Sequence, residues 1–328
     1  MKPVLENVTI EITNHCQLHC QHCGIWVEKE RHEMTASMVV RMMRELLERY
    51  QIFSVSITGG EPFLNRNCGR LLKALSLLRT QGAIRSFGVY SNAAYFEGVR
   101  RVFTNYGPFL KGMDMGISID GKPSTHDRLR GPGAYAKTMK TIQWLAENYG
   151  KDIVMEFKFT INQLNYGELS DVYQLARRFK ARFSPKIMES GVSDYYHRHE
   201  MPDTDTLAAP TAQMIESVRG QIAQILKDNY QGVDQQLVEA MMVLLAGGRK
   251  CIRACATPAK SLFVNSRRNI YPCLYLSPAG QVGVDGSLPE QLDSIRKQHS
   301  DAAAKGDCPR CFAYHGFLKK FNLEYLRR

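Results

Sequence analysis

Three cysteines with the spacing C-x3-C-x2-C lie close together near the start of the sequence, at Cys16, Cys20 and Cys23. Thiolates at such a spacing bind either zinc or an iron–sulfur cluster. A [4Fe–4S] cluster normally takes four cysteines, so three local ligands leave one iron able to bind another molecule. A tetrahedral zinc site is the alternative, and its fourth ligand would come from one of the neighbouring histidines, His15, His19 or His22.

A Gly-Gly-Glu-Pro sequence follows the second expected strand, at Gly59, Gly60, Glu61 and Pro62. Two consecutive glycines let the backbone come close to a ligand, because no Cβ atom stands in the way. The Glu61 carboxylate could then accept a hydrogen bond from an amine of that ligand. The same four residues alone would also suit an ordinary turn, so the motif gains its specificity from the cysteines one strand earlier.

Together the two motifs resemble the signature of the radical S-adenosylmethionine (SAM) superfamily, and both stand unaltered. The residue before the last cysteine, usually aromatic and hydrophobic in that family, is His22 here. The resemblance implies a partial (β/α)6 TIM-like barrel over residues 5–190, in which the open iron binds the amino and carboxylate groups of SAM. It also implies that an electron, supplied by a donor such as flavodoxin or ferredoxin, splits SAM into methionine and a 5′-deoxyadenosyl radical that abstracts a substrate hydrogen.

Residues after the fourth expected strand resemble the segment that the SPASM/twitch subgroup of this superfamily places across SAM. The segment comprises residues 118–121 (Ser-Ile-Asp-Gly) and 126–131 (His-Asp-x-x-Arg-Gly). By that resemblance Ser118 contacts SAM and Arg130 pairs with its carboxylate, which the guanidinium fork matches. A capped turn or a surface ion pair is the alternative for these residues. Three further polar residues at strand ends are candidate contacts of SAM or substrate: Asp120, which could equally hold its loop, and Ser91 with Asn92.

Four cysteines in the last third of the sequence form a second set: Cys255, Cys273, Cys308 and Cys311. Four thiolates satisfy a fully ligated [4Fe–4S] cluster, and zinc at the same residues is the alternative. The stretch 255–273 resembles the hairpin of twitch domains, although the usual turn glycine is Arg268 here. A single later C-x2-C pair implies the twitch form, with one auxiliary cluster, rather than the full SPASM form.

Two cysteines remain outside these sets. Cys251 lies four residues before Cys255. It could replace Cys255 as a ligand, have no role, or give a hydrogen atom to a substrate radical, as in the radical SAM epimerases that this arrangement resembles. Cys68 is expected to be a buried apolar residue.

Alternating strand and helix patterns must position these motifs. Strands are expected at 8–13, 53–58, 86–90, 113–119, 154–161 and 183–188, and helices at 35–50, 69–79, 95–103, 135–147 and 169–180. Such repeats argue for an α/β fold of parallel strands joined by right-handed crossovers, whose ligands gather at the carboxyl ends of the strands. Every motif of the first half follows a strand, so we expect them to meet there. A hairpin is expected later, at 261–273.

Length and composition set broader limits. The 328 residues suffice for a barrel over 1–190, a helical linker over 191–250 and a small Cys-rich twitch-type domain over 251–328. The sequence has no apolar run of bilayer length and no signal peptide, so we expect a cytoplasmic protein with no membrane partner. Its nine cysteines then favour metal binding over disulfides. The formal net charge is +11, but the basic residues are scattered, which disfavours a nucleic-acid partner.

Three functional hypotheses follow. The first is a radical SAM enzyme that oxidatively modifies a peptide or a small polar metabolite, by dehydrogenation or bond formation, with the auxiliary cluster as electron acceptor. No separate peptide-recognition module precedes Val8, which counts against a peptide. The second is redox-neutral epimerisation with Cys251 as hydrogen-atom donor. The third, a zinc-stabilised nucleic-acid-binding protein, leaves the Gly-Gly-Glu-Pro sequence and the Arg130 segment without a role.

Overall fold

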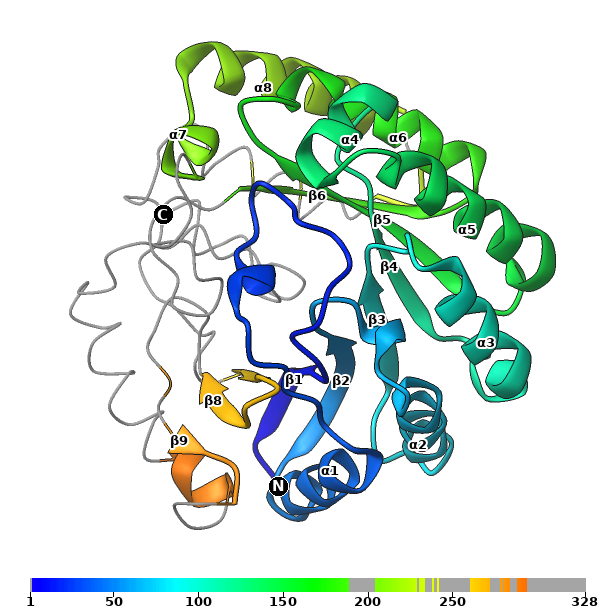
Figure 1. Cartoon of the computed structure of the whole chain (residues 1–328), viewed down its shortest axis with the longest axis vertical. Helices are drawn as coiled ribbons and strands as arrows, with labels where there is room; N and C mark the ends of the chain where they lie inside the picture. Colours follow the sequence, from blue (N-terminus) through cyan, green and yellow to red (C-terminus); the bar gives the residue numbers. More distant parts are fainter. Residues whose placement is uncertain are drawn as a thin grey trace.

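A computed structural model describes residues 2–188, 204–228, 230–233, 238, 241, 260–271, 278, 280–283 and 288–293. Six neighbouring parallel strands form one curved sheet in the order β6-β5-β4-β3-β2-β1, with helices along its outer side (Figure 1). The strands are β1 (Val4–Glu11), β2 (Gln51–Thr58), β3 (Ser86–Ser91), β4 (Asp114–Ser118), β5 (Val154–Ile161) and β6 (Arg182–Ile187). The expected partial barrel is therefore confirmed.

Towards the carboxyl ends of β1 and β2, successive residues alternate between two environments. Val8 and Ile10 of β1 and Ile57 of β2 are fully buried in the core beneath the helices. The residues between them, such as Thr9 and Ser56, are polar and face the inner side of the barrel. Parallel sheets covered on both faces usually show continuous apolar runs. The alternation here reflects an inner face that is polar.

Five helices lie close to where the sequence predicts them: α1 (Ala36–Arg49), α2 (Cys68–Thr80), α3 (Phe96–Tyr106), α5 (Ala134–Tyr149) and α6 (Leu169–Arg178). The Thr35 hydroxyl accepts a hydrogen bond from Met38 N and so caps α1, which buries Val39, Met42 and Leu46 at helical spacing. Two further helices, α7 (Thr204–Ala208) and α8 (Ala212–Lys227), lie within the stretch 191–250 that the sequence predicts to be helical. The helix α4 (Pro123–Arg130) was not predicted.

The hairpin expected at 261–273 is confirmed by β7 (Ser261–Val264) and β8 (Asn269–Tyr271), which pair in antiparallel fashion. Arg268, in the turn, has φ 69° and adopts the left-handed conformation that glycine usually takes there. β7 also pairs in parallel with β1, with Phe263 opposite Thr9. The hairpin and the short β9 (Gly280–Gln281) thereby extend the sheet of the barrel beyond β1, which the sequence did not predict.

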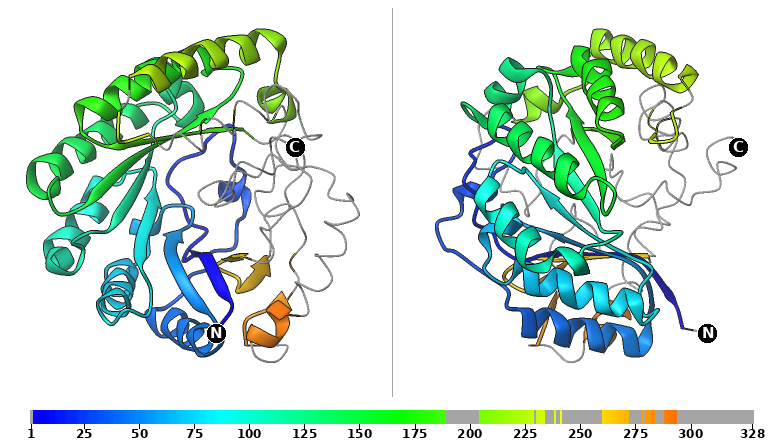
Figure 2. Two further views of the ribbon diagram at one scale, coloured as in Figure 1. Left: turned by 180° about the vertical axis from the view of Figure 1, so that it is seen from behind. Right: turned by 90° about the vertical axis from the view of Figure 1, so that its right-hand side faces the viewer.

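The long loop after β1 lies at the carboxyl end of the parallel strands. In the right-hand view of Figure 2 this loop and the N-terminus are at opposite ends of the sheet. The loop carries the three N-terminal cysteines, so the structure places them where α/β sheets bind their ligands. Among the described residues, no helix is both long and apolar enough to cross a membrane.

Candidate active site

The loop after β1 passes directly over the Gly-Gly-Glu-Pro sequence after β2. Gly60 N donates a hydrogen bond to Thr13 O, and Glu61 N donates one to His15 O, each at 2.8 Å. A Cβ atom on Gly59 would lie 2.4 Å from Thr13 O, and one on Gly60 would lie 2.4 Å from His15 O. The approach of the cysteine loop itself therefore requires both glycines, whereas the sequence suggested the approach of a ligand.

Glu61 is fully buried and joins the ends of β2 and β3. Its carboxylate accepts hydrogen bonds from Ser91 Oγ at 2.8 and 2.9 Å and from Asn92 N at 3.0 Å. It also accepts one from Phe63 N and so caps the short 3-10 helix Pro62–Leu64. Burial raises the pKa of Glu61 to about 7, although these donors oppose the shift. A contact between Glu61 and the amine of SAM stays a prediction.

The three cysteines of the loop pack on one small apolar base, formed by Leu18, Ala94 and Ala134. Asn92 Nδ2 donates a hydrogen bond to Cys16 Sγ at 3.6 Å, while Asn92 Oδ1 accepts one from Gln17 Nε2 at 2.9 Å. Asn92 was expected near a ribose or the substrate. The structure places it beside a candidate cluster ligand, and its contact with a ribose stays a prediction.

The surroundings of these thiols fit ligands of a positively charged iron–sulfur core. Burial raises the pKa of Cys16 and raises that of Cys20 to about 12, and repulsion from neighbouring thiolates adds to both shifts. Iron supplies the positive charge that stabilises thiolates in such a place. Within the described ranges, no three side chains of His, Cys, Asp or Glu converge where a single ion could bind. The three separate thiols fit a [4Fe–4S] cluster, which takes one thiolate at each of several irons.

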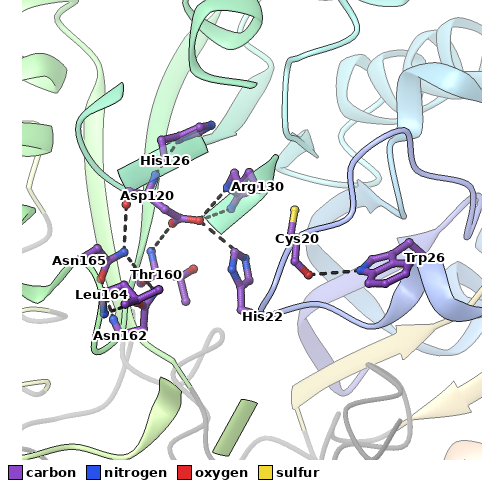
Figure 3. Close-up of polar contacts among 10 residues, drawn as sticks. All are labelled: Cys20, His22, Trp26, Asp120, His126, Arg130, Thr160, Asn162, Leu164 and Asn165. Carbon is purple, nitrogen blue, oxygen red and sulfur yellow. Dashed lines mark hydrogen bonds and ion pairs between the residues drawn. The ribbon is translucent and has the colours of Figure 1, made fainter. Parts of the chain in front are cut away.

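Asp120, just after β4, is the centre of a buried polar network (Figure 3). Its Oδ2 atom accepts a hydrogen bond from Arg130 Nε and lies 2.7 Å from both Arg130 Nε and Arg130 Nη2. Its Oδ1 atom accepts one from Thr160 N at 2.9 Å. His22 Nε2 lies 3.7 Å from Oδ2, and His126 Nδ1 accepts from Asp120 N at 3.1 Å. The network joins the cysteine loop to β4, α4 and β5.

Opposite charges keep the Asp120 carboxylate ionised. Burial alone would raise the pKa of Asp120, but Arg130 and His22 hold it below its usual range. A backbone hydrogen bond of 2.9 Å from Gln21 N to Leu129 O ties the same loop to α4. These contacts support the interpretation that Asp120 holds its loop. The guanidinium of Arg130 points to Asp120, and its pairing with the SAM carboxylate stays a prediction (Figure 3).

His126 is expected to make the stability of the fold sensitive to acid. Burial lowers the pKa of His126 to about 4, and among the described residues its Nε2 atom has no hydrogen-bond partner. The unfolded chain takes up this proton below pH 6.5 and the folded chain does not, so stability is lost as pH falls towards 4. His126→Asn keeps an acceptor for Asp120 N but does not titrate.

Urea unfolding at pH 7 and pH 5 should show a smaller acid destabilisation for His126→Asn than for the wild type. The full difference over the pH window is about 3 kcal/mol at most. An identical pH dependence in the two proteins would contradict this prediction.

The remaining sequence candidates fall into two groups. Ser118 is half-buried at the end of β4, opposite Lys158 of β5, and its contact with SAM stays a prediction. Pro62 is buried at the start of its 3-10 helix. Cys68 is fully buried, as predicted. Five cysteines lie outside the described residues: Cys251, Cys255, Cys273, Cys308 and Cys311.

Some contributors to the site were not predicted. His126 begins the motif at 126–131, but no role of its own was predicted for it from the sequence; in α4 it lies four residues before Arg130 and so shares a helix face with it. Phe263 and Tyr271 of the β7–β8 hairpin pack with Ile25 against Cys23. No local sequence pattern predicts that contact, because it depends on the pairing of β7 with β1.

A family model confirms the resemblance. The radical SAM superfamily model matches residues 10–176, which include the cysteine loop, the Gly-Gly-Glu-Pro sequence and the Asp120–Arg130 network. The chain therefore belongs to the radical SAM superfamily. Accordingly, Cys16, Cys20 and Cys23 form the motif for a [4Fe–4S] cluster and SAM.

Two curated relatives come from Bacillus subtilis (strain 168). The chain is 30% identical to the sporulation killing factor maturation protein SkfB over 167 residues, which are 51% of this chain and 38% of SkfB. It is 25% identical to the antilisterial bacteriocin subtilosin biosynthesis protein AlbA over 182 residues, 55% of this chain and 38% of AlbA. The match thus spans well under half the length of either relative.

Solved structures of Streptococcus suis SuiB share the fold. The SAM-bound structure has a TM-score of 0.64 at 16% identity, and the alignment covers 93% of this chain and 68% of the SuiB chain. The structure bound to the precursor peptide SuiA has a TM-score of 0.63 at 17% identity, and the alignment covers 93% of this chain and 66% of the SuiB chain.

Proposed function

We propose that this chain cleaves SAM reductively and uses the resulting radical to abstract a hydrogen atom from a substrate. The observation that carries the proposal is the cysteine loop, fixed at the carboxyl end of the barrel by the Gly-Gly-Glu-Pro turn and by Asp120. When bound there, SAM and the cluster would supply the 5′-deoxyadenosyl radical. The residues of the chain do the positioning: Asn92 orients Cys16, and Asp120 holds the loop through His22.

The substrate that we favour is a peptide, which would be modified by loss of hydrogen or by formation of a new bond. SkfB is named a maturation protein, AlbA a bacteriocin biosynthesis protein, and SuiB has been crystallised with a precursor peptide. These names favour a peptide over a small polar metabolite, which remains the alternative substrate class. They do not distinguish dehydrogenation from bond formation.

An auxiliary [4Fe–4S] cluster on Cys255, Cys273, Cys308 and Cys311 would complete the oxidative reaction by accepting the electron of the substrate radical. This proposal includes the division into a barrel over 1–190, a linker over 191–250 and a twitch-type domain over 251–328. The pairing of β7 with β1 means that part of the third region would lie in the sheet of the barrel. Flavodoxin or ferredoxin would supply the electron for SAM cleavage.

Anaerobic turnover with SAM, dithionite and a synthetic peptide from any small reading frame beside this gene tests the proposal. We expect 5′-deoxyadenosine in the reaction mixture and a peptide product lighter by two hydrogen atoms, both measured by mass spectrometry. Incorporation of deuterium from heavy water, with no loss of hydrogen, would instead indicate epimerisation. A purified protein that contains zinc but no iron or sulfide would refute the radical mechanism altogether.

A further inference from the structure

Cys23 is covered by two aromatic side chains from a distant part of the chain. Phe263 of β7 and Tyr271 of β8 are 7% and 5% exposed, and together with Ile25 they form a small apolar cluster against which Cys23 packs. The two rings meet edge to face, with centroids 5.8 Å apart and an interplanar angle of 63°. Edge-to-face contact is a stable arrangement for aromatic rings.

The hairpin that carries these rings is fastened to the barrel. The carboxylate of Glu11, at the end of β1, accepts hydrogen bonds from Ser266 N at 2.9 Å and from Ser266 Oγ. Arg267 forms an ion pair with Glu28 of the cysteine loop. These polar contacts tie the turn of the hairpin to β1 and to the cysteine loop, and so help to hold the rings beside Cys23.

The polar end of Tyr271 is satisfied within the hairpin. Asn265 Nδ2 donates a hydrogen bond to the Tyr271 hydroxyl at 3.3 Å, and Asn265 Oδ1 accepts one from Asn269 N across the turn. The aromatic ring can therefore lie against the cysteine loop while its hydroxyl is satisfied within the hairpin.

We propose that Phe263 and Tyr271 form a water-excluding cover over the Cys23 side of the SAM-binding cluster, and so lower its reduction potential and slow its loss of iron. The inference rests on the proposed function, because it assumes that Cys23 ligates the cluster. Reduction adds a negative charge to an already anionic cluster of thiolates, and water stabilises that charge. Excluding water therefore disfavours the reduced form, and solvent exposure is one determinant of cluster potential.

The test uses the full-length, anaerobically reconstituted holoprotein. Phe263→Ala removes one ring, and Phe263→Val also removes it but keeps a β-branched residue suited to a strand. Tyr271→Phe is the matched control, because it keeps the ring and loses only the hydroxyl. The potential is measured by EPR-monitored titration of the signal that changes when SAM is added, which separates this cluster from an auxiliary one. Iron release is followed with an anaerobic chelator.

We expect both Phe263 variants to have a less negative potential and to release iron on the order of tenfold faster, since residues around metal ligands have effects of that size. Tyr271→Phe should stay close to the wild type in both measurements. Unchanged potential and iron release in Phe263→Val, with a circular dichroism spectrum like that of the wild type, would overturn the inference and leave the proposed function intact. A wild-type protein without a SAM-responsive cluster would overturn both.

Discussion

Asp120→Ala is expected to lower the free energy of unfolding by about 3–5 kcal/mol, because it leaves a buried guanidinium without its counter-ion. Asp120 is fully buried and Arg130 is 7% exposed. The same carboxylate accepts a hydrogen bond from Thr160 N, so a buried backbone donor would also lose its partner. Urea unfolding followed by circular dichroism at neutral pH measures the difference.

Two further variants identify the cause of that loss. Asp120→Asn keeps the volume and an acceptor for Thr160 N but removes the charge, so its destabilisation should be smaller than that of Asp120→Ala. The double variant Asp120→Ala/Arg130→Met removes the buried cation together with the carboxylate. It should therefore lose less stability than the sum of the two single variants. Simple additivity would show that the Asp120–Arg130 pair does not carry the effect.

The architecture was predictable from the sequence because local alternation marks each strand. Val154–Ile161 was predicted with the bounds of β5. The helix α4 was missed because its sequence lacks a clear apolar periodicity. Its buried side chains are His126, Leu129 and Arg130, and two polar residues among three hide the apolar stripe that normally reveals a helix.

The position of β7 was not predictable for a different reason. The residues 261–264 (Ser-Leu-Phe-Val) favour a strand, but nothing in them selects β1 as a parallel neighbour. In the folded barrel β1 is the last of the six parallel strands, so its outer edge can pair with β7. That edge exists only once the barrel has folded. Strand pairing between distant segments is a property of the whole chain, while strand propensity is local.

The candidate site, too, was predictable from the sequence only in part. Motif spacing identified Gly59, Glu61 and Arg130 as residues that gather at the strand ends, but it did not give their contacts. Gly59 accommodates the backbone of Thr13, and Glu61 accepts hydrogen bonds from Ser91. Much of the signature therefore contributes to holding the cysteine loop in place. A motif can therefore be recognised in the sequence before its contacts within the fold are known.

Replacing Cys16, Cys20 or Cys23 singly with alanine is expected to abolish SAM cleavage and to remove about four iron atoms per chain, the content of one [4Fe–4S] cluster. Three thiolates bind three of the four irons and leave one iron open for SAM. The loss of any one thiolate therefore leaves a second iron without a protein ligand. The three thiols lie on one apolar base, and no fourth cysteine belongs to that described cluster. Iron and sulfide assays and the yield of 5′-deoxyadenosine after anaerobic reconstitution measure the effect.

Cys68→Ala is the matched control for this series. Cys68 is fully buried in the main hydrophobic core rather than in the cluster of the loop cysteines. Its replacement should leave the iron content and the yield of 5′-deoxyadenosine unchanged and should cost only about 1 kcal/mol of stability through the small cavity. If a variant of the cysteine loop kept its full iron content and its SAM-responsive EPR signal, the open iron would have to be held by other residues. The fixed position of the loop over Gly59 and Gly60 would then need another purpose.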